Sequence, residues 1–187
     1  LLVNKQREVM ALIIPEYRRM AELGRIELST TPFYHPILPL LNDTDLAKVA
    51  APEIHLPANR FAHPEDARTH IARAIEYHEK FFGKRPAGMW PAEGSVAEEI
   101  IPMLAEAGIT WSASDEGVLA RSLGIHIERD FAGVMRNPEV LYRAYLAGTG
   151  DKRGSMVFRD HTLSDLGGFG YSKWDYKNAV NDLIDRF

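Results

Sequence analysis

Six acidic residues fall in, or after, short β-prone runs of the chain. They are Glu27, Glu93, Asp115, Glu116, Asp160 and Asp165. In α/β barrels the loops that follow parallel strands converge on one mouth, where the chemistry takes place. Two carboxyl groups that meet there can supply the nucleophile and the acid–base catalyst for cleavage of a glycosidic bond. The alternative is that acidic residues at such junctions only cap helices.

Helix capping explains the position of Glu93 less well than it explains the positions of the other acidic residues. Glu93 lies in the stretch GMWPAEGSV (88–96), whose aromatic, proline and glycine residues offer its charge no partner. The capping-box pattern of Ser95 and Glu98 makes Ser95 the expected cap of the next helix. We therefore favour chemistry for Glu93, whereas for Asp115 and Glu116 capping and chemistry explain the position equally well.

Aromatic residues accompany these carboxyl groups along the chain. Trp90 precedes Glu93, Trp111 precedes Asp115, and Phe169 and Tyr171 follow Asp165. Flat aromatic side chains suit a carbohydrate site, because sugar rings present apolar C–H faces as well as hydroxyl groups. The alternative is that the aromatic residues belong to the core. Taken alone, the pattern gives a modest preference for a glycosidase.

The composition limits the possible partners. The net charge of −4 gives no reason to expect nucleic acid or an anionic membrane as a partner, and a neutral substrate fits it as well. The chain has no cysteine, which excludes disulfides and thiolate metal sites. No apolar run reaches the roughly 20 residues of a membrane-spanning helix.

The pattern of helix, glycine and strand occurs twice, at 21–30 and 105–114, and predicts an α/β fold with a parallel sheet in one domain. We expect strands at 26–29, 109–113, 140–146 and 155–159. We expect helices at 4–23, interrupted near Pro15, at 66–82, from Ser95 to before Gly108, and at 175–187. The segment 42–64 is expected to be a loop with a short helix.

Three stretches together resemble glycoside hydrolase family 57. They are GRIELSTTPFYHPILPLL (24–41), GMWPAEGSV (88–96) and FRDHTLSDLGGFGYS (158–172), and they are similar, in order, to the second, third and fourth conserved regions of that family. The family contains α-amylases, amylopullulanases, 4-α-glucanotransferases and branching enzymes, which are retaining enzymes acting on α-glucans. The resemblance implies a distorted, incomplete seven-stranded (β/α) barrel, truncated at both ends, with no cofactor.

The resemblance also implies roles for individual residues. Glu93 matches the catalytic nucleophile and Asp165 the general acid/base, with Asp165 preferred over Asp160 because of its spacing to Phe169. Residues expected to bind substrate are Glu27, His35, Trp90, Asp115, Asp160 and Phe169. In a retaining enzyme the two carboxyl groups stand roughly 5–5.5 Å apart. Asp165 is expected to be held protonated by a nearby negative charge and by an apolar setting formed by Phe169 and Tyr171, with Arg159 and His161 tuning the site or pairing with local acids.

The chain is expected to be part of a longer protein. It starts with Leu1, not Met, and ends inside an expected helix. The first conserved region of the family is expected before Leu1 and the fifth after Phe187. Gly167 and Gly168 make the fourth motif richer in glycine than the family pattern. No leader sequence is visible, and the expected location is cytoplasmic.

Two other functions remain open. A metal-dependent carbohydrate deacetylase uses a similar barrel but needs a compact Asp/His/His cluster, for which the seven histidines show no suitable spacing. A non-catalytic relative could bind glucans without turnover. The presence of both Glu93 and Asp165 argues against this reading, because no structural role requires two acidic residues at these positions. The sequence does not separate hydrolysis from transglycosylation, and it gives no oligomeric state.

Overall fold

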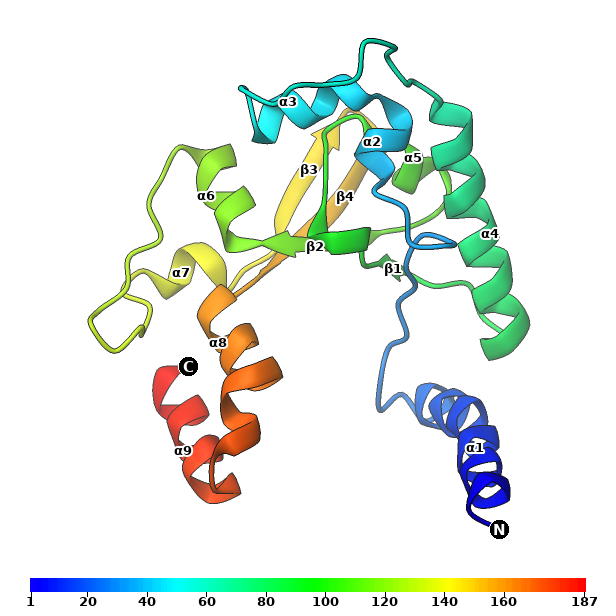
Figure 1. Cartoon of the computed structure of the whole chain (residues 1–187), viewed down its shortest axis with the longest axis vertical. Helices are drawn as coiled ribbons and strands as arrows, with labels where there is room; N and C mark the ends of the chain where they lie inside the picture. The colour runs from blue at the N-terminus through cyan, green and yellow to red at the C-terminus, as the bar shows by residue number, and fades with distance from the viewer. The chain divides into compact units, whose positions relative to one another are not determined.

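The computed structural model describes residues 1–187 (Figure 1). The longer helices are α1 (Leu2–Glu22), α4 (Pro64–Phe82), α5 (Ile100–Glu106), α6 (Glu116–Leu123) and α9 (Tyr176–Arg186). The short ones are α2 (Leu38–Asn42), α3 (Ala47–Ala50), α7 (Pro138–Leu141) and α8 (His161–Asp165). The strands are β1 (Gly88–Met89), β2 (Trp111–Asp115), β3 (Tyr145–Thr149) and β4 (Lys152–Arg159). No helix is long and apolar enough to cross a membrane.

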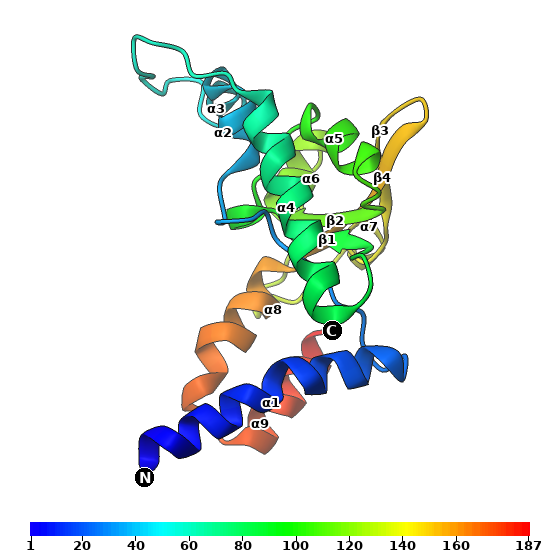
Figure 2. The ribbon, with the colours of Figure 1, turned by 90° about the vertical axis from the view of Figure 1, so that its right-hand side faces the viewer.

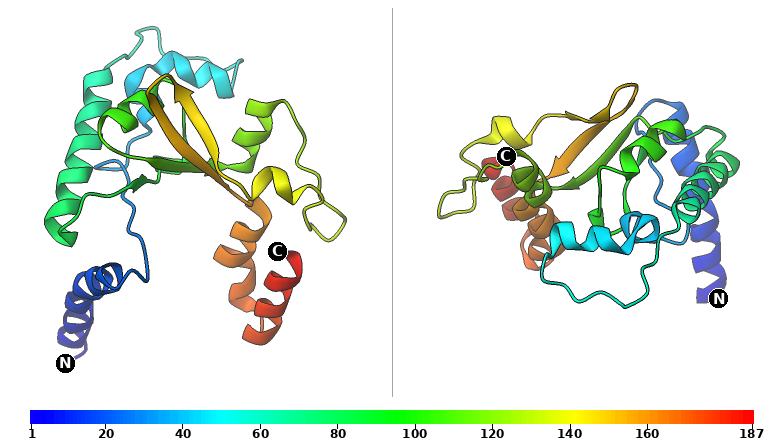
Figure 3. Two further views of the ribbon diagram at one scale, coloured as in Figure 1. Left: turned by 180° about the vertical axis from the view of Figure 1, so that it is seen from behind. Right: turned by 90° about the horizontal axis from the view of Figure 1, so that it is seen from above.

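The strands form one sheet in the order β1-β2-β4-β3. β1 and β2 are parallel, with Gly88 opposite Trp111 and Met89 opposite Ser112. Strands β3 and β4 are joined by a two-residue turn at Gly150 and Asp151, which makes them a hairpin (Figure 3). The α/β class is thus confirmed, and the chain contains a four-stranded sheet of largely parallel character.

The chain divides into two compact units. The first unit is Leu1–Ser112 with Ala147–Gly154, and the second unit is Ala113–Leu146 with Ser155–Phe187. The core of the first unit forms around α4, whose residues Ala67, Ile71, Ala74 and Ile75 follow helical spacing and are all buried. They pack with Met89 of β1 and with buried residues of α5. Figure 1 and Figure 2 show α4 lying beside β1. Pro64 starts α4 and Gly83, with φ of 74°, ends it, so the sequence signals agree with the observed helix.

The second unit has a smaller core. It consists of Leu119, Met135 and Leu141, with Ile127, Val140, Tyr145 and Phe158 packed around it. Helix α9 is the last element of this unit, and its N-cap is Asp175, whose side chain accepts hydrogen bonds from the backbone N–H groups of Lys177 and Asn178. The predicted helix at 175–187 is therefore confirmed.

Four local predictions were wrong. Helix α1 runs through Pro15 without interruption, because a proline removes one backbone donor but need not end a helix. The segment 26–29 is not a strand, since only Thr30 pairs, through a parallel bridge to Met89. Ser95 caps no helix, because its segment remains extended and α5 starts five residues later. Pro138 begins α7, so the predicted strand at 140–146 starts only at Tyr145.

Candidate functional site

Glu93 of the first unit lies against His35, which comes from a segment 58 residues earlier. Nε2 of His35 is 3.3 Å from Oε1 of Glu93, and Nδ1 of His35 is 3.2 Å from Oγ1 of Thr31. The Glu93 side chain is 71% exposed, so its second oxygen is open to a ligand. The structure thus joins the predicted residues His35 and Glu93, and it adds Thr31, which the sequence analysis missed.

The backbone at this place is unusual. The non-glycine residues with positive φ are Tyr34 (63°), His35 (57°) and Glu93 (57°), and the chain contains no others. Such conformations are costly for residues with a Cβ atom and collect at functional sites, where the surrounding structure holds them. The left-handed residue Glu93 lies in a short 3₁₀ segment, Ala92–Gly94, and its side chain is exposed.

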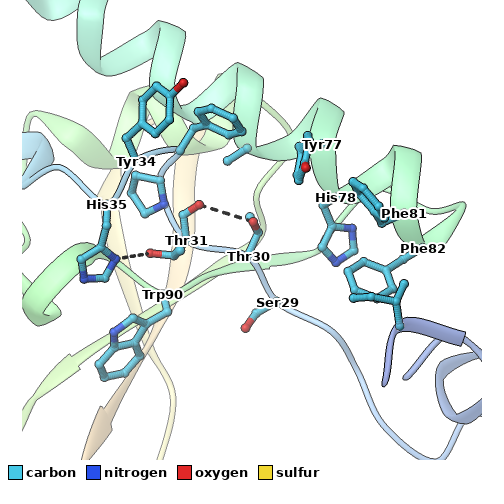
Figure 4. Close-up of a pocket in the computed structure, with 14 residues that line it drawn as sticks. Ser29, Thr30, Thr31, Tyr34, His35, Tyr77, His78, Phe81, Phe82 and Trp90 are labelled. Carbon is cyan, nitrogen blue, oxygen red and sulfur yellow. Dashed lines mark hydrogen bonds between the residues drawn. The ribbon is translucent and has the colours of Figure 1, made fainter. Parts of the chain in front are cut away.

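A cleft of about 810 Å³ lies beside His35. Figure 4 shows His35 and Trp90 at one end of it and Phe81 and Phe82 of α4 at the other. Thr30, Thr31 and Ser29 supply hydroxyl groups to its wall. An aromatic lining with several hydroxyl groups is suited to a ligand that has both apolar faces and hydroxyls.

Glu27 lies apart from this cleft and holds Trp111. Its Oε1 accepts a 2.6 Å hydrogen bond from the indole Nε1 of Trp111. The indole ring covers Gly88 so closely that a Cβ atom at Gly88 would lie 2.0 Å from Cε2 of Trp111. In this structure Glu27 therefore positions an aromatic ring.

Asp115 and Asp165 of the second unit share two partners. Nε of Arg159 is 2.9 Å from Oδ2 of Asp115, and Nη1 of Arg159 is 3.6 Å from Oδ1 of Asp165. His161 lies 3.1 Å from Asp115 through Nδ1 and 3.2 Å from Asp165 through Nε2. The structure thus brings these two predicted residues into one cluster with Arg159 and His161.

Asp115 also serves as the cap of α6, because its Oδ1 accepts the backbone N–H of Gly117 at 2.9 Å. Burial would raise the pKa of the Asp115 carboxyl. The hydrogen bonds from Gly117 and His161 and the charge of Arg159 outweigh burial and hold that pKa below its usual value. Asp115 is thus a fixed anion, and its oxygens are already occupied.

Asp160 belongs to a second, more buried network. It is 7% exposed, caps α8 through the N–H of Leu163, and accepts a 2.7 Å hydrogen bond from the hydroxyl of Tyr142. Nη2 of Arg129 lies 3.0 Å from Asp160 and also contacts Glu116. Burial would lower the pKa of Arg129, but the two carboxylates outweigh it and raise the pKa. The substrate contact predicted for Asp160 is disfavoured by this burial.

The prediction of an apolar setting around Asp165 was wrong. Phe169 is 77% exposed, and the hydroxyl of Tyr171 donates to Asp182 at 2.8 Å. The groups next to Asp165 are instead the guanidinium of Arg159 and the imidazole of His161. The glycine-rich segment 166–170 forms a wide helical turn that carries Phe169 outward.

Residues that the sequence analysis did not single out complete these clusters. Arg129 and Tyr142 lie 31 and 18 positions before Asp160 in the chain, in segments without motif character. No periodicity or spacing signals such pairs. Thr31 does lie four residues before His35, within the motif already noted. No group of three or more His, Cys, Asp and Glu side chains is arranged to hold a metal ion.

Comparison with known proteins supplies the family. The profile of glycosyl hydrolase family 57 matches residues 1–187. Alpha-amylase 1 of Dictyoglomus thermophilum is 31% identical over 106 residues, which is 54% of this chain and 12% of that protein. The chain thus spans about one eighth of the length of this relative.

Two solved structures share the fold. The 4-α-glucanotransferase of Thermococcus litoralis matches 92% of the chain with a TM-score of 0.60 and 21% identity, over 21% of its own length. The α-amylase AmyC of Thermotoga maritima matches 87% with a TM-score of 0.57 and 20% identity, over 25% of its own length. The profile covers every residue from Leu1 to Phe187, so the chain belongs to glycosyl hydrolase family 57.

Proposed function

We propose that the protein containing this chain is a retaining glycosidase or transglycosylase that acts on α-glucans such as starch, glycogen or maltooligosaccharides. Membership of family 57 and the named activities of the relatives support this class of enzyme and favour it over a deacetylase. The observation that carries the proposal is Glu93, an exposed carboxylate held by a strained backbone against His35. The 187 residues are proposed to form part of one (β/α) catalytic barrel, in the cytoplasm.

Glu93 is the proposed nucleophile. Its Oε1 faces His35, which leaves Oε2 to attack the anomeric carbon of the glucan. The bond from that carbon to the glycosidic oxygen breaks, and Asp165 gives its proton to the departing oxygen. In the second half, water or a sugar hydroxyl gives a proton to Asp165 and replaces Glu93 on the anomeric carbon. Water as acceptor makes the enzyme an amylase, and a second glucan makes it a transferase.

The other predicted residues are proposed to act around this reaction. Trp90 and His35 line the aromatic cleft, where a sugar ring could stack and donate hydroxyl hydrogen bonds. Glu27 supports Trp111, and the exposed ring of Phe169 is free to contact substrate. Asp115 is held by Arg159 and His161, and Asp160 is held by Arg129, so we assign both aspartates positioning roles.

The test is Glu93→Gln in the full-length protein, assayed on soluble starch and maltooligosaccharides. Loss of the nucleophile is expected to reduce kcat by at least a thousandfold. Glu98→Gln is the matched control, because Glu98 is an exposed glutamate five residues further on. Activity of Glu93→Gln within tenfold of the wild type would reject the assignment. Binding of maltooligosaccharides by the wild type without any turnover would reject the enzyme class.

A further inference from the structure

His161 bridges two aspartates of the second unit. Its Nδ1 lies 3.1 Å from Oδ2 of Asp115, and its Nε2 lies 3.2 Å from Oδ2 of Asp165. An ionised carboxylate only accepts hydrogen bonds, whereas an imidazolium donates from both nitrogens. Each ring nitrogen of His161 faces a carboxylate, but the donor Nη2 of Arg159 also lies 3.3 Å from Nδ1. Nε2 is therefore the nitrogen positioned to share a proton with Asp165.

The side chains that contact His161 carry more negative than positive charge. Arg159 contacts Asp115 at 2.9 Å and Asp165 at 3.6 Å, and its Nη2 lies 3.3 Å from Nδ1 of His161. Glu116 accepts the backbone N–H of His161 at 3.2 Å and is itself paired with Arg129. Two carboxylates thus face the His161–Arg159 pair, and one guanidinium neutralises only one of them.

The two aspartates that contact His161 differ in how firmly their side chains are held. Asp115 is fixed by the N–H of Gly117 and by Arg159, whereas the Asp165 side chain is 48% exposed. His161 and Asp165 stand four residues apart on α8, a spacing that puts them on one face of a helix. Asp115 can therefore hold the ring from one side while Asp165 remains accessible on the other.

We propose, building on the function proposed above, that His161 is a positioning residue that keeps the transferable proton on the Asp165–His161 pair, with Asp115 as its anchor. The pair carries one proton in the resting enzyme. That proton leaves through Asp165 to the glycosidic oxygen as the bond to the anomeric carbon breaks. The proton of the acceptor hydroxyl returns to Asp165 in the second half, so the pair is restored. An imidazole thus performs the task that the sequence analysis assigned to an apolar pocket.

This role predicts how activity depends on pH and on the leaving group. A carboxyl and an imidazole in contact release their protons as a coupled pair, so the pH–rate profile reports the pair and neither residue alone. Without His161, the charged partner left beside Asp165 is Arg159 at 3.6 Å, a guanidinium that does not exchange its protons with a carboxyl. The basic limb of the pH–rate profile is therefore expected to move to lower pH. For substrates whose leaving group needs no proton, the rate of the first half of the reaction is expected to stay unchanged when His161 is replaced.

The experiment compares His161→Gln with the wild type in the full-length enzyme. For maltopentaose, kcat/KM at pH 7 is expected to fall at least tenfold, and the basic limb to move down by at least one pH unit. For a 4-nitrophenyl α-maltooligosaccharide, kcat/KM is expected to stay within threefold. His63→Gln is the matched control, because His63 is also exposed and also pairs with a nearby carboxylate, Glu65, at 2.8 Å.

A second variant, Asp115→Asn, tests the anchor, because asparagine still caps a helix but has no charge. Its basic limb is expected to move in the same direction as that of His161→Gln. An unmoved limb in Asp115→Asn would overturn the anchoring role. Equal losses on both substrates, or an unchanged pH profile in His161→Gln, would overturn the proposal for His161. A wild type without activity on α-glucans would instead overturn the proposed function.

Discussion

Nε2 of His35 lies 3.3 Å from Oε1 of Glu93, and both residues have a left-handed backbone with φ of 57°. Each such conformation costs a residue with a Cβ atom of order 1–3 kcal/mol. The contact therefore joins two strained positions that come from distant parts of the first unit. Because both partners of the contact are strained, the positions of these two side chains are held at a cost to the free energy of unfolding.

The strain at Glu93 can be measured by comparing Glu93→Gly with Glu93→Ala. Both variants remove the carboxylate, but only glycine adopts φ of 57° without penalty. Glu93→Gly is expected to exceed Glu93→Ala in free energy of unfolding by about 1 kcal/mol. Urea unfolding of the two full-length variants gives the difference. Equal stabilities would mean that the backbone relaxes at this position.

His35 is expected to support the reaction by fixing one oxygen of Glu93. His35→Gln is expected to lower kcat/KM on maltooligosaccharides about tenfold to a hundredfold, because the carboxylate loses a partner that orients it. The measurement is steady-state kinetics beside His55→Gln, an exposed histidine of the loop before α4. A loss in His35→Gln no larger than in His55→Gln would remove His35 from the site.

The sequence predicted elements where several signals agree and failed where one signal stood alone. Helix α4 has apolar spacing, Pro64 at its start and Gly83 at its end, and its prediction was confirmed. The capping box at Ser95 rested on two residues, and the chain stays extended there. A local pattern cannot decide whether the tertiary structure will use it.

The candidate site shows the same division. Glu93 was singled out because its local neighbours give no structural reason for a charge. Its contact with His35 could be expected only through the family resemblance, since 58 residues separate them. Around Asp165, the apolar setting expected from Phe169 and Tyr171 is not formed, whereas Arg159 and His161, which were expected to tune the site or to pair with local acids, do lie beside it. Side-chain direction in a short helix decides which of these neighbours makes contact, and residue types alone do not reveal it.

Gly88 is expected to be required for the position of Trp111. A Cβ atom there would lie 2.0 Å from the indole ring, which must move and release its hydrogen bond to Glu27. Gly88→Ala is expected to lower the free energy of unfolding by about 1–3 kcal/mol and to change tryptophan fluorescence. Gly167→Ala is the control, because nothing lies within 4 Å of its added Cβ. Equal effects of the two substitutions would refute the steric argument.

The free energy of unfolding is expected to fall at alkaline pH as Tyr142 ionises. Burial, followed by the hydrogen bond to Asp160 and the charge of that carboxylate, raises the Tyr142 pKa to about 12. An unfolded tyrosine titrates near 10. Because the folded-state pKa is the higher one, the stabilisation is fully present below pH 10 and is lost as the pH rises through 12.

The variant Tyr142→Phe isolates this contribution. At pH 8 it is expected to be less stable than the wild type by about 1 kcal/mol, because the hydrogen bond to Asp160 is lost. The difference is expected to shrink between pH 10 and pH 12, where only the wild type responds to the ionisation of Tyr142. Tyr176→Phe, at an exposed tyrosine of α9, controls for the loss of a hydroxyl. A constant difference across this range would show that the Tyr142 hydroxyl does not titrate differently in the folded and unfolded protein.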